Sequence, residues 1–308
     1  MKTSSSILIT GGAGFIGSHT VNLLLKKNKA VTVLDNLSTG KLSNLDLKSP
    51  LLRFVEGDVT HYSALLEEVK QCESILHLAA LPSVPQSIED PIGTQAVNMN
   101  GFLHVLQAIR EVSRPIRLVY ASSAAVYGNS PLLPCCDETF LKYPVLSPYA
   151  LQKIQDEQYA DLYARLFNIP SLALRYFNVY GEGQDPQSVY SGVISRFLSR
   201  YQQKEKITLF GDGEQSRDFI HVSDVARANV LALECEYNGV LNIATGKAET
   251  LRNLVSYIEE KNKGKIEVEM KAPRPGDIRT SYAAIIKAKQ YLHFQSEISL
   301  KTGIGQLC

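Results

Sequence analysis

Short apolar segments alternate regularly with longer helix-forming segments through the first half of this 308-residue chain. The short segments are apolar or β-branched, which is typical of strands buried on both faces of a sheet. Such alternation predicts an α/β fold, a doubly wound parallel (Rossmann) sheet with right-handed connections. We expect strands over residues 6–10, 30–34, 52–55, 74–78, 117–120 and 171–176. We expect helices over residues 14–26, 62–70, 93–113 and 147–167.

The character of the chain changes after residue 177. Gly, Pro and long polar loops become more frequent, as in GEGQDPQ, FGDGEQSRD and KAPRPGDIR. This composition indicates a smaller, partly irregular α/β domain over the carboxyl edge of the sheet. We therefore divide the chain into residues 1–177 and 178–308. A stretch of about 218–246 looks like core elements that return to the first domain.

The overall charge and the cysteine content exclude several function classes. A net charge of +1 gives no reason to expect nucleic acid or a membrane as a partner. The five cysteines have no CxxC spacing and the histidines form no ligand-spaced pair, so we expect neither disulfides nor a metal. His77, in HLAA, is interpreted as a packed histidine. We find no signal peptide or membrane-spanning run and expect a cytoplasmic location.

A glycine-rich loop follows the first predicted strand and opens the first predicted helix. Gly11, Gly14 and Gly17 would let the backbone approach a pyrophosphate beside the free N–H groups of the helix. Asp35 follows the second predicted strand, where an acidic side chain binds the ribose hydroxyls of NAD and repels the additional phosphate of NADP. This pattern predicts NAD as the cofactor; the alternative is a plain glycine turn with a turn acid.

Tyr149 and Lys153 are four residues apart on the helix predicted after the fifth strand, so they share one helix face. A phenol with a pKa near ~10 is a poor base at neutral pH, and a neighbouring ammonium favours the phenolate. Ser123 follows the fifth strand, at the edge where doubly wound sheets bind ligands; the alternative is a turn hydroxyl. The same YxxxK spacing occurs at Tyr257 and Lys261, which we interpret as part of a surface helix.

Seven motifs, in this order, resemble the extended short-chain dehydrogenase/reductase family: TGGAGFIGSH, DNLSTG, GDV, HLAA, SSAAVYG, SPYALQK and LRYFNVYG. The resemblance runs from residue 6 to about residue 290. It implies NAD-dependent action on nucleotide sugars, with Ser123, Tyr149 and Lys153 as the catalytic triad. It also implies an NAD site made of Gly11, Gly14, Phe15, Ile16, Gly17, Asp35, Asn36, Ser38, Thr39, Gly40, Asp58, Val59, Leu78, Ala79, Ala80, Asn98, Tyr149, Lys153 and Tyr176.

The segment SSAAVYG narrows the reaction that the resemblance implies. Nucleotide-sugar 4,6-dehydratases of this family carry an Asp-Glu pair where this chain has Ala124 and Ala125. Alanine transfers no proton, so elimination of water is disfavoured. Epimerisation at C4 needs only one base and a hydride carrier. Tyr149 would take the C4 hydroxyl proton while hydride passes to NAD, and the 4-keto sugar would turn before hydride returns to its other face.

The second domain has the residues that a nucleotide sugar requires. The resemblance implies a substrate site of Ser83, Ser123, Tyr149, Asn178, Val193, Arg217, Arg274, Asp277 and Ser281. Arginine suits a diphosphate because its planar fork bonds phosphate oxygens in pairs; the alternative is a pair of solvated loop charges. Ser281 is small where epimerases confined to unacetylated sugars carry tyrosine. GEGQDPQSVYSGVISRF and SVP further resemble bacterial UDP-N-acetylglucosamine 4-epimerases, so we favour UDP-GlcNAc/UDP-GalNAc, with UDP-Glc/UDP-Gal as a further pair.

Other interpretations stay open. A UDP-glucuronate 4-epimerase or decarboxylase would need a further cationic residue to bind the sugar carboxylate. A non-catalytic NAD-binding sensor would be expected to lose the tyrosine or the lysine. The helices over 93–113 and 147–167 resemble those through which relatives dimerise as a four-helix bundle, so we expect a homodimer. The chain also departs from the family: Ala284 replaces a frequent aspartate, and we expect no final helix after TGIG.

Overall fold

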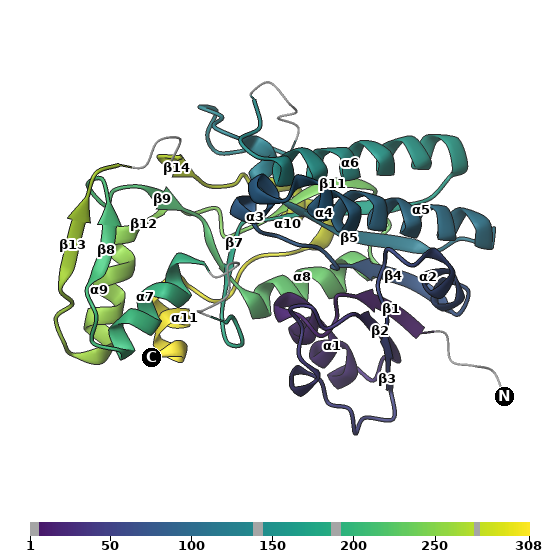
Figure 1. The fold of residues 1–308 in the computed structure, drawn as a ribbon, viewed down its shortest axis with the longest axis horizontal. Helices are drawn as coiled ribbons and strands as arrows, with labels where there is room; N and C mark the ends of the chain where they lie inside the picture. The colour runs from purple at the N-terminus through teal and green to yellow at the C-terminus, as the bar shows by residue number, and fades with distance from the viewer. Residues whose placement is uncertain (1–5, 138–143, 186–191, 274–277) are drawn as a thin grey trace.

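Seven parallel strands form the central sheet (Figure 1). The computed structural model describes residues 6–137, 144–185, 192–273 and 278–308. The strand order is β11-β6-β5-β4-β1-β2-β3. The strands are β1 (Ser6–Thr10), β2 (Val31–Asp35), β3 (Leu52–Glu56), β4 (Cys72–His77), β5 (Arg117–Ser123), β6 (Ser171–Tyr176) and β11 (Gly239–Ile243). The six predicted strands are confirmed, and the returning segment supplies the seventh.

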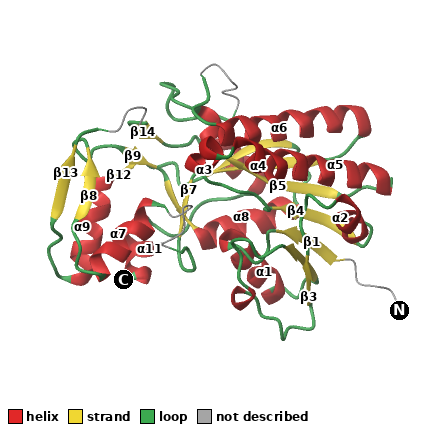
Figure 2. Cartoon of the chain, viewed as in Figure 1, coloured by secondary structure: helices red, strands yellow, loops and turns green. Residues whose placement is uncertain are grey.

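Helices cover both faces of this sheet (Figure 2), which confirms the doubly wound fold. Alternate residues of β1 face opposite sides: Ile7 and Ile9 belong to one buried core and Leu8 to the other. The first core includes side chains of α1 (Phe15–Lys26), α8 (Val222–Glu234) and α10 (Ile286–Leu292). The second includes side chains of α2 (Tyr62–Val69), α5 (Gly101–Val112) and α6 (Pro148–Phe167).

The helix predicted over 93–113 is wrong in its start and its continuity. The structure has α3 (Val84–Glu89), α4 (Pro91–Gln95), a π-helical stretch over Ala96–Asn100, and then α5. Asp90 caps α4 by accepting a hydrogen bond from the Gly93 N–H at 2.9 Å, and proline fits the first turn of a helix. The π turn carries Asn98, whose side chain points into the protein rather than to solvent.

A third hydrophobic core lies among the elements at the left of Figure 1. Its elements are α7 (Val193–Gln202), β8 (Ile207–Phe210), α9 (Leu251–Asn262), β13 (Val268–Lys271) and α11 (Leu300–Leu307). Two smaller sheets join it to the large sheet: β7 (Asn178–Tyr180) with β10 (Phe219–His221), and β9 (Ser216–Arg217) between β12 (Glu249–Thr250) and β14 (Thr280–Ser281).

Helix α11 is the last helix of the described residues. TGIG lies inside it, Ser299 caps it, and Gly303 packs closely against the Tyr180 ring. Among the described residues, none of the helices has both the length and the apolar character that crossing a bilayer requires.

Candidate functional site

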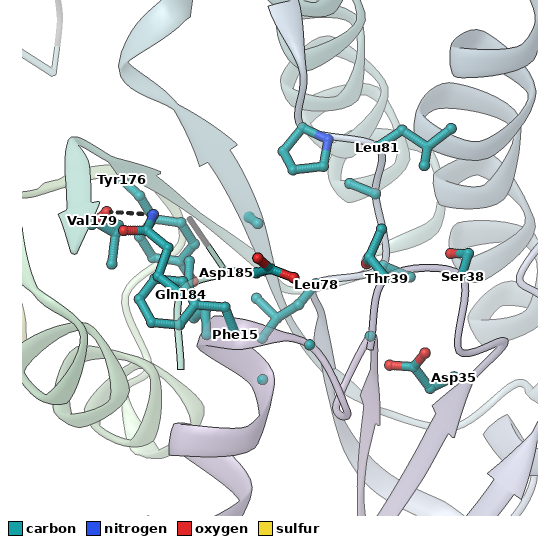
Figure 3. A pocket seen from close by; sticks show the side chains of 18 of the residues that line it. Phe15, Asp35, Ser38, Thr39, Leu78, Leu81, Tyr176, Val179, Gln184 and Asp185 are labelled. Carbon is teal, nitrogen blue, oxygen red and sulfur yellow. Dashed lines mark hydrogen bonds between the residues drawn. The ribbon is translucent and has the colours of Figure 1, made fainter. Parts of the chain in front are cut away.

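A cavity of about 1020 Å³ opens at the carboxyl edge of the sheet. Figure 3 shows Asp35, Ser38 and Thr39 at one end and Tyr176, Val179 and Gln184 at the other. The first half of the chain and the segment around β7 and α7 both contribute to its walls. The predicted site residues that line it are Gly11, Gly14, Phe15, Ile16, Gly17, Asp35, Asn36, Ser38, Thr39, Asp58, Val59, Leu78, Ala79, Ala80, Ser123, Tyr149, Lys153, Tyr176, Asn178 and Val193.

The glycine-rich loop closes one end of the cavity in a form that only glycine permits. Gly11 has a φ of +70°, and a Cβ there would lie 2.7 Å from the Ala79 backbone nitrogen. A Cβ on Gly17 would overlap the carbonyl oxygen of Gly11. Gly14 begins α1 without a side-chain cap, so no side chain competes for the N–H groups of the first turn. The loop therefore presents backbone donors and a helix N-terminus to an anion.

Asp35 is fixed in this loop by both of its carboxylate oxygens. Its Oδ2 accepts a hydrogen bond from the Ala13 N–H at 2.9 Å, and its Oδ1 accepts one from the Leu37 N–H at 2.8 Å. Each carboxylate oxygen has a further lone pair, so the side chain keeps acceptor capacity toward the cavity. Asp35 thus shapes the glycine loop, a role that the sequence did not indicate, and it also lines the cavity.

Asp58 stands next to Asp35 at the end of β3 and accepts hydrogen bonds on both oxygens. The donors are the N–H and hydroxyl of Thr60, and the amide of Asn36 at 2.7 Å. Burial raises the pKa of Asp58, but these hydrogen bonds outweigh it and hold the pKa below the usual range. The carboxylate therefore stays ionised, and it orients Asn36 along the cavity wall.

Ser123, the last residue of β5, and Tyr149, in the first turn of α6, both line the cavity. Ser147 caps α6 by accepting a hydrogen bond from the Ala150 N–H at 3.1 Å, and the Tyr149 N–H donates to the Ser87 hydroxyl at 3.1 Å. The Ser123 hydroxyl accepts a hydrogen bond from the Ala125 N–H at 3.1 Å, a strand-end turn, and still lines the cavity. Its O–H remains a donor toward a ligand.

Lys153 lies one turn beyond Tyr149 and is 2% exposed. Its Nζ forms an ion pair with Asp156 Oδ2 at 3.0 Å. Burial lowers the pKa of Lys153, yet the attraction of Asp156 and then of Tyr149 outweighs burial and leaves the pKa raised. The side chain is therefore a buried ammonium beside a phenol.

His77 and Tyr257 agree with their structural interpretations. Nδ1 of His77 lies 2.8 Å from the Thr10 hydroxyl oxygen, and burial, with a smaller effect of Lys153, lowers the pKa of His77 to about 3. Tyr257 is on α9, where its hydroxyl donates to Glu249 at 3.4 Å, away from the residues that line the cavity. Position in the fold therefore separates the two YxxxK pairs.

Several predicted site residues do not line the cavity. Asn98 is fully buried and holds the chain at Leu81, whose N–H donates to it at 2.7 Å and whose carbonyl accepts from it at 3.1 Å. Ser83 caps α3 by accepting from the Gln86 N–H at 3.1 Å. Gly40 packs against the loop beside Asp35. Arg274 and Asp277 lie outside the described residues.

Arg217 and Ser281 are neighbours on paired strands, although neither lines the cavity. Strands β9 and β14 are parallel, with Arg217 and Ser281 in register. Asp218, which is fully buried, holds this arrangement. Its N–H donates to the Ser281 carbonyl at 2.9 Å, and its own carbonyl accepts from the Asn178 N–H at 3.0 Å and from the Asn178 side chain at 3.1 Å.

Asp218 was not predicted as a functional residue, and its sequence signal is its place beside Arg217 in SRDF. Its carboxylate accepts four hydrogen bonds, two from Thr245 and one each from the Gly246 and Ala283 N–H groups. Two residues at the rim of the cavity were also not predicted. Lys41 and Asp185 line the cavity and form an exposed ion pair at 3.6 Å between its two sides, a contact that no local motif indicates.

The chain matches a known protein family and known proteins over most of its length. The model of the NAD dependent epimerase/dehydratase family matches residues 7–244. A Methanocaldococcus jannaschii protein, provisionally named a UDP-glucose 4-epimerase, is 41% identical over 304 residues, which are 98% of this chain and 96% of the relative. A UDP-glucuronate 4-epimerase of Thermodesulfobacterium geofontis is 33% identical over 309 residues, with 96% of this chain and 93% of the relative covered.

The fold of the whole chain is also found in a solved structure. The UDP-N-acetylglucosamine 4-epimerase of Methanobrevibacter ruminantium, in complex with UDP-N-acetylmuramic acid, superposes with a TM-score of 0.91 at 36% identity. The match covers 99% of this chain and 98% of that one. Sequence and structure thus agree over nearly the full length, and the chain belongs to the NAD dependent epimerase/dehydratase family.

Proposed function

We propose that this protein is a UDP-sugar 4-epimerase, an isomerase that inverts C4 of a UDP-hexose with bound NAD. One observation carries the proposal: Tyr149, Lys153 and Ser123 line the same cavity as the glycine loop and Asp35. In the proposed division of labour, residues 1–177 with the returning stretch of about 218–246 bind NAD. Residues 178–308 bind the nucleotide sugar.

The residues present fit NAD. The glycine cradle has no Cβ where a pyrophosphate would approach, and Asp35 presents its carboxylate at the end of β2, where it would accept from ribose hydroxyls. When bound, NAD would supply a hydride acceptor and donor for C4. Lys153 would hold the nicotinamide ribose, and Phe15, Leu78 and Tyr176 would pack around the dinucleotide.

The chain itself supplies the proton chemistry. Tyr149 acts as a phenolate, which the Lys153 ammonium stabilises, and it becomes the neutral phenol when it takes the proton of the C4 hydroxyl. Ser123 donates a hydrogen bond to the same sugar oxygen. Ala124 and Ala125 transfer no proton, so water is not eliminated from the 4-keto sugar. Tyr149 returns its proton to O4 after the sugar has turned, and C4 is inverted.

For the sugar we propose UDP-GlcNAc/UDP-GalNAc, with UDP-Glc/UDP-Gal as the further pair. The support is Ser281, whose small side chain stands in register with Arg217 on the adjacent strand. An arginine suits the diphosphate, and a small neighbour leaves room for a C2 acetamido group. Arg274 and Asp277 are proposed to join this site on the strength of the sequence alone.

The test is to incubate the purified protein, without added NAD, with UDP-GlcNAc, UDP-Glc and UDP-glucuronate separately. We expect C4 epimers of the first two, and a Tyr149→Phe variant that retains NAD but is slower by about a thousandfold, since it lacks the proton-transferring oxygen. Conversion of glucuronate alone would support the glucuronate epimerase instead. Conversion of none, with Tyr149→Phe indistinguishable from the wild type, would support an NAD-binding sensor.

We also propose that the protein is a homodimer joined through α5 and α6. Helices α3 and α4 pack against α6, and each of the three carries an exposed apolar side chain: Ile88 by 60%, Ile92 by 83% and Leu151 by 47%. Exposed apolar side chains on neighbouring helices support an interface between copies of the chain. Light scattering after gel filtration should give twice the chain mass, and a monomer would contradict the proposal.

A further inference from the structure

The ion pair between Lys153 and Asp156 is a buried feature for which the proposed function has no role. The Lys153 Nζ and Asp156 Oδ2 are 3.0 Å apart, and the two side chains are 2% and 1% exposed. On the same helix Asp161 and Arg165 form a pair of similar geometry that is 67% exposed on both sides. A carboxylate is costly to bury, so its position beside the proposed catalytic lysine calls for an explanation.

Other ionisable groups that face this pair do not balance the charge of Lys153. On α6, Glu157 is committed to Arg175 of β6 at 2.6 Å and to the Ser122 hydroxyl. His77 of β4 is neutral, since its pKa is lowered to about 3. Tyr120 of β5 is buried, and burial raises its pKa well above the usual range. Asp156 is therefore the carboxylate that compensates Lys153.

Asp156 has acceptor capacity beyond this pair. Within the described part of the chain its Oδ1 has no hydrogen-bond partner. Burial raises the pKa of Asp156 to about 6, and Lys153 limits that rise, so the carboxylate is ionised at neutral pH. Lys153 has three N–H donors, and Asp156 accepts from one of them. The other two stay available for the phenol and for a ribose.

We propose that Asp156 is a positioning residue for Tyr149: it acts through Lys153, whose ammonium it holds in place and whose charge it partly offsets at the phenol oxygen. The inference rests on the proposed function for the roles of Tyr149 and Lys153. Where Lys153 keeps its proton, removing the carboxylate charge leaves its ammonium uncompensated, so phenolate forms more readily.

The experiment is an ultraviolet absorbance titration of phenolate formation with NAD present. Each protein is read against its own Tyr149→Phe counterpart, so that the difference reports Tyr149 alone. In Asp156→Asn, which keeps the size of the side chain, we expect the titration midpoint to move about one pH unit lower. The acidic limb of kcat/KM should move with it. Asp161→Asn on the same helix is the matched control and should leave both midpoints unchanged.

Three outcomes of the titration decide the proposal. A midpoint in Asp156→Asn that equals the wild-type value, or lies above it, overturns it. Asp156→Glu should return the midpoint toward the wild-type value, and a failure to do so also counts against it. Asp156→Ser removes the charge with a smaller side chain and replaces Asp156→Asn if circular dichroism shows that variant unfolded. Because the titration needs no turnover, it tests Asp156 even if the wild type epimerises none of the sugars.

Discussion

The two ends of the cavity are built in different ways. At the dinucleotide end, Gly11, Gly14, Gly17 and the Asp35 carboxylate act within one strand-loop-helix unit and the strand beside it. Beside the other end, Asp218 connects Asn178, which lines the cavity, with Ser281 and Thr245, which do not line it and are far apart in the sequence. The first end depends on backbone geometry that short motifs specify, and the second depends on a tertiary hydrogen-bond network around one buried carboxylate. Substitutions should therefore damage the two ends differently.

Among the substitutions that compare the two ends, Gly17→Ala at the dinucleotide end is expected to have the largest effect. A Cβ there overlaps the Gly11 carbonyl oxygen, and forced overlaps of this kind cost about 1–3 kcal/mol. We expect the affinity for NAD to fall by roughly a hundredfold, measured by equilibrium dialysis after removal of bound nucleotide. Gly305→Ala is the control, because its nearest neighbour would be the Lys261 side chain at 3.9 Å. An unchanged NAD affinity in Gly17→Ala would contradict the statement that the dinucleotide end depends on the backbone geometry of its glycines.

Asp218→Asn should instead act on stability and on the substrate end. The amide of Asn puts an N–H group where the carboxylate accepts hydrogen bonds, so at least one buried donor loses its partner, at a cost of about 2 kcal/mol. Chemical denaturation should show this loss, with a raised KM for the UDP-sugar and a nearly unchanged affinity for NAD. Asp212→Asn is the control, because its ion pair with Arg279 is exposed to solvent and contributes little to stability. Equal losses in the two variants would contradict the role given to Asp218.

The difference between local motifs and tertiary contacts also explains which features could be predicted from the sequence alone. The strands, the glycine loop and the Tyr149–Lys153 pair were predictable, because each follows from local spacing and from its position along alternating elements. The π turn at Asn98 and the network of Asp218 were not, because each depends on residues brought together only by folding. Asp156 was missed for a related reason: an aspartate on a helix indicates a surface position unless the packing around it is known.

The smallest effect is expected from Ser281→Tyr, which tests the sugar. A tyrosine in register with Arg217 would fill the space proposed for the acetamido group. Pocket contacts of this size change selectivity by about tenfold or somewhat more. We expect slower turnover of UDP-GlcNAc with UDP-Glc turnover retained, measured as the ratio of kcat/KM values. Thr280→Ser, on the same strand, is the control and should leave the ratio unchanged. An unchanged ratio in Ser281→Tyr would show that Ser281 does not determine which sugar is converted.

We propose that the hydrogen of C4 leaves as hydride, stays in the site and returns to the same carbon, while Tyr149 transfers only the hydroxyl proton. The most direct measurement is the fate of deuterium at C4 of UDP-GlcNAc during conversion in ordinary water. We expect the epimer to keep its deuterium at C4. An epimer with protium at C4 would show exchange with solvent and would contradict the proposed chemistry of Tyr149 and Lys153.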